Sequence, residues 1–418
     1  MRILRFSSIR LPKDTRMFIQ LQVLFGGLVS VLNLFVNTFL LKAYGSFSAE
    51  VLLYNGIMAV AQPFAMVTAM KISASRNALL TQKLGFVFYG LALAVLCVFG
   101  DKVSSFYPLF AGMISFGAGY YYCTYGIQML TYTNDGSRDM VAALISLFGA
   151  IVAVVLPLIS GFLITAFDAY TGYRITFGIA ALLAVAALQT IKHLSPLPKH
   201  QKGRTTWQVA KVMLSNKNGV LIMIANGLIS CITFTLPIFV TLLFYNLMPN
   251  EFLISVNSTI GNIVGFLAAG LYGYVVTQKN RVKASVFAAA VMLIPSLVIL
   301  FGLNILPIMF FEAVYRLCVP FMSNPVVNLH FKIVEDLGLH GDVGAEVHLV
   351  REVFVSAGRI LGLLLVWIAP QTNEGAVFVI LCMIGAAVIN AWILWIIGKN
   401  QNKAQLAQKD SGQELSNV

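Results

Sequence analysis

The segment GAVFVILCMIGAAVINAWILWII, residues 375–397, contains no charged side chain and decides the fold class. Its 23 residues, coiled as an α-helix, are long enough to cross the ~30 Å hydrocarbon layer of a membrane. Lipid offers no water to the backbone, so a run of this length is expected to cross as a helix with internal hydrogen bonds. The segment therefore predicts a transmembrane helix near the C-terminal end of the chain.

Similar apolar segments recur along the 418 residues, of which 59% are hydrophobic and 11% charged. We expect about twelve transmembrane helices. The expected spans are 17–41, 51–71, 84–100, 106–131, 140–166, 174–192, 219–246, 252–277, 284–303, 305–330, 348–369 and 375–397. This pattern predicts an all-α polytopic membrane protein and excludes a soluble enzyme.

A basic segment between the sixth and seventh spans divides the chain into two sets of six helices. The expected organisation is a tail (1–16), a six-helix half (17–192), a linker (193–218), a second six-helix half (219–398) and a tail (399–418). Within the linker, Thr205–Leu214 has apolar residues at helical spacing beside lysines, which is typical of a short amphipathic helix at the membrane surface.

The two halves are expected to be pseudo-symmetric, because short sequences recur at matching places. GGLVS at 26–30 in the first span corresponds to NGLIS at 226–230 in the seventh. Basic segments also follow both the second and the eighth spans. Repeated halves of this kind are typical of transporters whose substrate site lies between the repeats.

Lysine and arginine concentrate in alternate loops, which predicts the orientation of the chain. The basic set includes Arg2, Arg5, Arg10, Lys71, Arg76, Lys83, Lys199, Lys202, Arg204, Lys279, Arg281, Lys283, Lys399 and Lys403, whereas the other loops offer Lys42, Lys102 and Arg174. Because basic loops stay in the cytoplasm, we expect a multi-pass protein of the cell membrane with both termini cytoplasmic. The net charge of +12 is spread over one membrane face, so anionic lipids are expected partners and nucleic acid is not.

The chain resembles the major facilitator superfamily in three features: six plus six helices, a basic linker, and basic loops after the second and eighth spans. The segment from Arg138 to Gly161, with Pro157 and Ser160 near its end, is similar to that family's fifth helix, although Ser160 replaces a glycine. The loops at 71–83 and 273–283 lack the family's usual aspartate. The resemblance implies a secondary transporter, and the glycine-rich form of the fifth-helix element is associated with exporters.

Polar side chains at helical spacing mark the faces of these spans that point into the protein, because polar groups facing lipid are costly. The candidate substrate-binding residues on such stripes are Asn33, Asn37, Tyr121, Tyr125, Gln128, Asn226 and Thr233. We expect the first helix of each three-helix set to line a central cavity and the third to face lipid. The alternative is that these groups only join helices to one another.

Charged residues inside the tenth and eleventh spans are the sharpest functional signal, since each costs about 2.5–3.5 kcal/mol to insert. Glu312 and Arg316 are four residues apart, and Glu352 and Arg359 lie two turns apart, with His348 one turn earlier. We expect Arg316 and Arg359 to bind an anionic group of the substrate and Glu312, Glu352 and His348 to carry protons. The alternative is a set of ion pairs that holds a gate closed.

The sequence therefore predicts a secondary transporter that moves a small organic solute, with an organic anion favoured, by proton-coupled alternating access. No GxxxxGK[ST] loop is present, which argues against direct ATP drive. We expect a monomer with no cofactor and no metal. Two alternatives stay open: a lipid or glycolipid flippase of the same fold, and a membrane-embedded enzyme that acts on lipid-linked substrates.

Overall fold

A computed structural model describes residues 11–45, 49–99, 102, 105–133, 135–167, 169–197, 204–277, 280–300, 302–339, 344–369 and 372–416. Within these ranges the chain is helical and has no strand. The helices are α1 (Lys13–Tyr44), α2 (Ala49–Ser75), α3 (Ala78–Phe99), α4 (Tyr107–Tyr132), α5 (Asp135–Ala166), α6 (Ala169–Lys192), α7 (Thr206–Ser215), α8 (Lys217–Leu247), α9 (Glu251–Val275), α10 (Arg281–Val291), α11 (Leu293–Leu300), α12 (Ile305–Asp336), α13 (Gly344–Ile368) and α14 (Asn373–Ser416).

The predicted all-α membrane fold is confirmed. Among the described residues, ten helical segments are long and apolar enough to cross a membrane, one of them made of α10 and α11 together. The remaining long helices, α4 and α13, run within the same bundle and pack against α2, α3 and α8. The described bundle therefore contains twelve elements of membrane-crossing length, as the sequence predicted.

The expected ninth span, 284–303, is not one continuous helix. It divides at Met292 into α10 and α11. Pro295 lies four residues after Val291, so its ring opposes the Val291 carbonyl and no N–H is present to bond it. The proline accounts for the break at this point.

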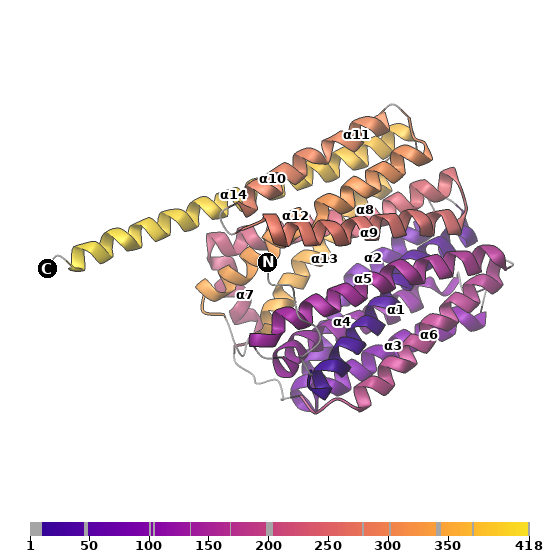
Figure 1. The fold of residues 1–418 in the computed structure, drawn as a ribbon, viewed down its shortest axis with the longest axis horizontal. Helices are drawn as coiled ribbons and strands as arrows, with labels where there is room; N and C mark the ends of the chain where they lie inside the picture. The colour runs from indigo at the N-terminus through magenta and orange to yellow at the C-terminus, as the bar shows by residue number, and fades with distance from the viewer. Residues whose placement is uncertain are drawn as a thin grey trace.

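The helices form two bundles that lie side by side (Figure 1). Helices α1–α6 pack together, as do α8–α14, and the two bundles meet mainly where α2 lies on α13 and α5 on α9. Inside the second bundle, α8 and α13 approach so closely at Gly227 and Gly358 that a Cβ on Gly358 would collide with the Gly227 carbonyl. Large apolar side chains of α3, α6, α10, α11 and α14 are exposed, as expected for helices that face lipid.

The linker helix predicted at Thr205–Leu214 is present as α7. Thr205 caps it: its hydroxyl accepts a hydrogen bond from the Gln208 N–H, and the Gln208 side chain accepts one from the Thr205 N–H. Val209 and Met213 are buried against α8 and α13, whereas Trp207 is 79% exposed. We call the side of the molecule that carries α7 and the start of α1 the linker face, and the other side the opposite face.

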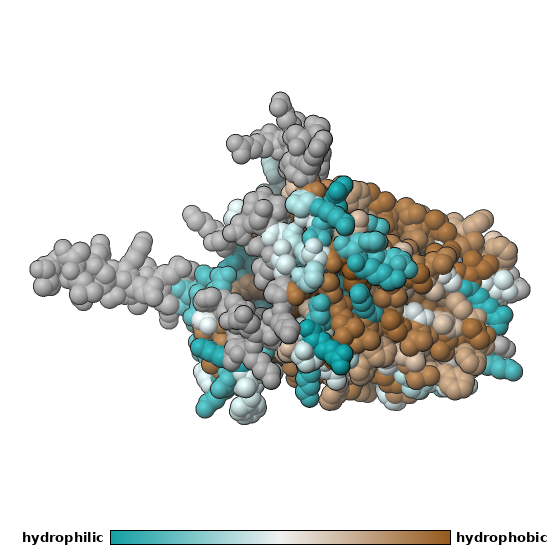
Figure 2. Space-filling view, turned by 90° about the horizontal axis from the view of Figure 1, so that it is seen from below, coloured by the Kyte–Doolittle hydropathy of each residue, from teal (hydrophilic) through white to brown (hydrophobic). Residues whose placement is uncertain are grey.

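The surface has the distribution expected of a membrane protein. Figure 2 shows a broad hydrophobic area over the bundle, with most of the hydrophilic residues in the left half of the view and a smaller group at the right end. The two polar ends are therefore the expected membrane boundaries.

Candidate functional site

A polar cavity of about 290 Å³ lies between the two bundles. Its walls come from α1, α2 and α5 on one side and α8, α9 and α12 on the other. The polar residues that line it are Ser30, Asn33, Asn37, Tyr54, Asn55, Thr233, Thr241, Asn257, Ser258, Asn262, Glu312 and Arg316. All of these positions belong to the parts of their helices nearer the opposite face.

Three asparagines form a connected wall on the first bundle. The Asn37 amide donates to the Asn33 carbonyl at 2.8 Å, and the Asn55 amide donates to the Asn37 side-chain oxygen at 2.7 Å. Asn55 also donates to the Val51 carbonyl at 2.8 Å, which fixes its rotamer. This wall presents amide groups in set orientations, which suits hydrogen bonding to a solute.

The Glu312–Arg316 pair lies on the facing wall. The Arg316 Nε donates to Glu312 Oε1 at 2.7 Å, and the Glu312 side chain is almost fully buried. The second carboxylate oxygen, Oε2, has no hydrogen-bond partner among the described residues. Gly261 leaves room for the pair, because a Cβ there would lie 3.2 Å from both Arg316 Cγ and Glu312 Oε1. Buried polar atoms are normally satisfied, so the free oxygen is a site for a proton or a ligand donor.

On the opposite face, the two bundles are joined by an ion pair. The Lys42 ammonium at the end of α1 donates to Glu251 Oε1 at the start of α9, at 3.0 Å. The Tyr173 hydroxyl donates to the same carboxylate oxygen at 3.2 Å. Lower down, the Asn262 amide of α9 donates to the Ala153 carbonyl of α5 at 2.9 Å. The Lys42–Glu251 pair therefore joins the bundles on the opposite-face side of the cavity, and the Asn262–Ala153 contact joins them at its wall.

The second predicted ion pair lies on the linker side of the cavity. Arg359 bonds Glu352 Oε1 at 2.9 Å and reaches across to Gln62 of α2 at 2.9 Å. Its guanidinium lies 5.3 Å from the ring centroid of Phe234, which itself lines the cavity. Arg359 therefore joins the two bundles beneath the cavity and does not line it.

The structure does not bring the fourth-span candidates to the cavity. Tyr121 stacks on Phe25 and donates to Gln22, Tyr125 lies beside Tyr121, and the Gln128 and Gln82 side chains exchange two hydrogen bonds of 2.9 and 2.6 Å. None of these fourth-span residues lines this cavity. These residues lie in the turns of α4 that approach the linker face, where they join α1, α3 and α4.

Two further candidates also lie away from the cavity. Asn226, in the first turns of α8, accepts a hydrogen bond from the Arg351 Nε at 2.7 Å. His348 lies one turn before Arg351 at the start of α13, near the linker face. Of the predicted set, the cavity brings together Asn33, Asn37, Thr233, Glu312 and Arg316.

The sequence reasoning missed the contribution of α2 and α9. Asn55, Asn257, Ser258 and Asn262 line the cavity. Ser258 and Asn262 are four residues apart, beside Asn257. The polar spacing of the eighth span was therefore a signal that could have found the α9 residues.

Sequence comparison finds distant relatives. No family model matches the chain. The uncharacterized protein YqgE of Bacillus subtilis (strain 168) is 22% identical over 343 residues, which cover 80% of this chain and 78% of that protein. An uncharacterized protein of Geobacillus stearothermophilus, from the sodM 3′ region, is 23% identical over 160 residues, or 38% of this chain and 72% of that protein.

Solved structures share the fold over nearly the whole chain. PepTSo, a transporter of the POT family, superposes with a TM-score of 0.73 at 12% identity, covering 94% of this chain and 99% of that one. The nucleoside transporter NupG gives 0.68 at 13% identity, covering 93% and 100%. A bacterial metal transporter gives 0.65 at 10% identity, covering 93% and 100%. The chain therefore has the fold of these polytopic membrane transporters.

Proposed function

We propose that this protein is a secondary transporter that moves a small organic anion together with a proton by alternating access. The observation that carries the proposal is the cavity between the bundles, where the Glu312–Arg316 pair faces a wall of asparagines. Its volume of about 290 Å³ suits a small polar metabolite. The transporters that share the fold support the general class.

The ion pair suggests how a proton and an anion are coupled. When Glu312 is ionised, its carboxylate forms an ion pair with the Arg316 guanidinium, which is then not free to bind the solute. Protonation at the free Oε2 removes the negative charge of Glu312, so Arg316 is released to bind a carboxylate or phosphate of the solute. The proton and the anion then enter the cavity together, and loss of the proton restores the ion pair and expels the anion.

The contacts on either side of the cavity supply the gates for alternating access. The Lys42–Glu251 pair joins the bundles on the opposite face, and the Arg359–Gln62 contact joins them on the linker side. Both contacts are formed in the structure, and rocking of one bundle against the other must break one of them while the other stays formed. In this scheme Glu352 and Arg359 act in the gate, whereas Glu312 and Arg316 bind the solute and the proton.

A binding screen followed by transport tests the proposal. Purified protein is screened for thermal stabilisation by small carboxylates, phosphates and matched neutral metabolites, because a ligand of the folded state raises its apparent stability. The stabilising compounds are then offered to proteoliposomes with and without a pH gradient. We expect an anion to accumulate only with the gradient. Stabilisation by neutral compounds alone, or movement of labelled phospholipid in place of solute, would contradict the proposal.

A further inference from the structure

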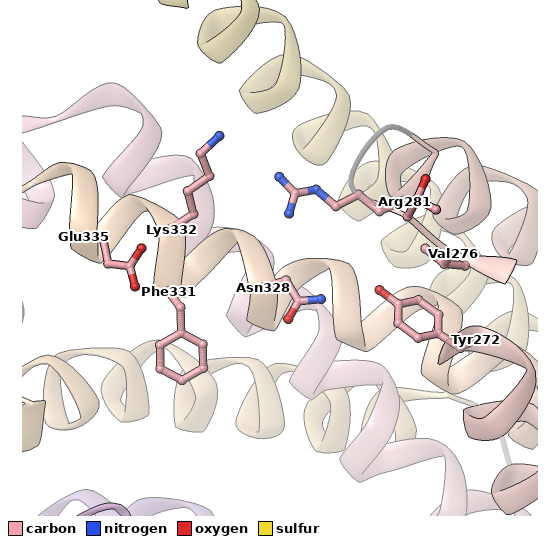
Figure 3. Close-up of a pocket in the computed structure, with 8 residues that line it drawn as sticks. Tyr272, Val276, Arg281, Asn328, Phe331, Lys332 and Glu335 are labelled. Carbon is pink, nitrogen blue, oxygen red and sulfur yellow. The ribbon is translucent and has the colours of Figure 1, made fainter. Parts of the chain in front are cut away.

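A second cavity lies at the linker face of the second bundle, away from the transport site. It has a volume of about 580 Å³ and is formed where α9 ends, α10 begins and α12 passes between them (Figure 3). Its walls carry Arg281, Lys332, Glu335, Asn328, Tyr272 and Phe331. None of these residues lines the cavity between the bundles.

Two cations converge in this crevice. Figure 3 shows the Arg281 guanidinium and the Lys332 ammonium extending toward one another from opposite walls. Within the described residues no carboxylate lies within 4.0 Å of either group, and Lys332 donates to the neutral Gln401 side chain at 3.3 Å. Like charges held close together repel, so this arrangement favours an anion between them.

Neutral donors complete the recognition of an anion. Asn328 of α12 and Tyr272 of α9 also lie in the lining, and Figure 3 shows the Asn328 amide and the Tyr272 hydroxyl directed toward one another. A phosphate has several acceptor oxygens, which a guanidinium, an ammonium and an amide can share. Glu335 lies one turn beyond Lys332 and leaves the lining with one more positive charge than negative.

Two of the helices that form the crevice also carry exposed apolar side chains. Leu267 and Leu271 on α9 are 63% and 47% exposed, and Phe331 on α12 is 58% exposed. Phe331 lies in the lining of the crevice, and both helices are long and apolar enough to cross a membrane, so apolar surface is available on the same helices as the cations. A free phosphate cannot use this surface, whereas the acyl chains of a phospholipid can.

We infer that this crevice binds an anionic phospholipid, with its phosphate between Arg281 and Lys332 and its acyl chains along α9 and α12. Basic pockets between transmembrane helices are a general means of holding such headgroups. The inference does not depend on which solute the protein transports or on whether it transports one. It assigns a lipid to the helix junction at the linker face.

Delipidated protein in neutral detergent tests the inference. Phosphatidylglycerol, phosphatidylcholine with the same acyl chains, and inorganic phosphate are titrated separately while thermal unfolding is followed, and bound lipid is counted by native mass spectrometry. We expect phosphatidylglycerol alone to raise the unfolding temperature, by a few degrees, and to remain bound. Equal stabilisation by phosphatidylcholine, or stabilisation by inorganic phosphate alone, would overturn the lipid assignment.

Matched variants locate the site. Arg281→Gln should abolish the stabilisation by phosphatidylglycerol, whereas Lys283→Gln, which removes the same charge from an exposed position of the same helix outside the lining, should retain it. Glu335→Gln should bind phosphatidylglycerol more tightly because the acid in the lining is lost. An equal response of Arg281→Gln and Lys283→Gln would place the lipid elsewhere, even if Arg281→Gln alone unfolded at a lower temperature.

Discussion

Glu312 and Arg316 occupy neighbouring turns of α12 and form one unit in the cavity wall. Their spacing of four residues lets both side chains share a helix face, and burial makes their mutual attraction stronger than at a surface. A pair that is buried costs desolvation free energy, which a purely structural role does not require. The unpartnered Oε2 of Glu312 is the feature that distinguishes this pair from a closed structural ion pair.

Glu312→Gln tests the proton site at this scale. The amide cannot be protonated and deprotonated, so we expect solute binding to persist while accumulation no longer follows the pH gradient. A gradient of one pH unit supplies about 1.4 kcal/mol per proton, which corresponds to about tenfold accumulation of the solute. We expect Glu312→Gln to lose this tenfold accumulation. Uptake into proteoliposomes measures it. Glu374→Gln, at an exposed position of α14, is the control and should keep the full factor.

Arg316→Lys and Arg359→Lys separate solute binding from gating. Both keep the positive charge and lose the planar fork that binds a carboxylate with two hydrogen bonds. We expect Arg316→Lys to weaken solute binding by about tenfold or more, since hydrogen bonds to charged groups contribute about 1.5–3 kcal/mol. Arg359→Lys should leave the dissociation constant nearly unchanged and alter the transport rate. Titration calorimetry gives the first quantity, and a larger binding loss in Arg359→Lys would contradict the assignment.

At the scale of elements, the cavity exists because α1, α2 and α5 face α8, α9 and α12 without filling the space between them. The helices touch above and below it, through Lys42–Glu251 and Arg359–Gln62. Gly261 has no side chain at the point where α9 passes the Glu312–Arg316 pair, which leaves space for the pair. Polar contacts between bundles are easier to exchange for water than apolar packing, so these are natural positions for gates.

Glu251→Gln should open the cavity toward the opposite face. The substitution weakens the ion pair with Lys42, so we expect a larger fraction of molecules with the α1–α9 contact broken. In a background free of native cysteines, Ser258→Cys in the cavity wall should then react several times faster with a bulky maleimide than it does with Glu251 intact. The double exchange of Lys42→Glu with Glu251→Lys should return the rate toward its original value. No change in labelling would show that the ion pair does not hold this end closed.

At the scale of the whole molecule, the linker face and the opposite face differ in charge. Lys71, Arg76, Arg204 and Arg281 belong to loops and helix ends on the linker face, where α7 also lies. From the positive-inside rule we expect this face to be cytoplasmic. The expectation rests on loop charge and places both chain ends in the cytoplasm.

Cysteine labelling in intact cells checks the orientation. In a background free of native cysteines, Met248→Cys, in the turn between α8 and α9, should react with a reagent that does not cross membranes. Asn280→Cys, before α10 on the linker face, should react only after the cells are permeabilised. Labelling of Asn280→Cys from outside, with Met248→Cys protected, would reverse the assigned orientation.

The sequence by itself determined the class of fold, the presence of twelve helical elements of membrane-crossing length among the described residues and the presence of α7, because these depend on local apolar length and helical spacing. It also found Glu312 and Arg316, since charges within a span are conspicuous whatever surrounds them. Only the tertiary structure shows that Glu312 and Arg316 line the cavity whereas Glu352 and Arg359 lie outside it. It also shows that Tyr121, Tyr125 and Gln128 are not part of the cavity lining. A polar stripe shows that a face is inward, but depth along the bundle and the neighbouring helix decide whether that face meets a cavity or another side chain.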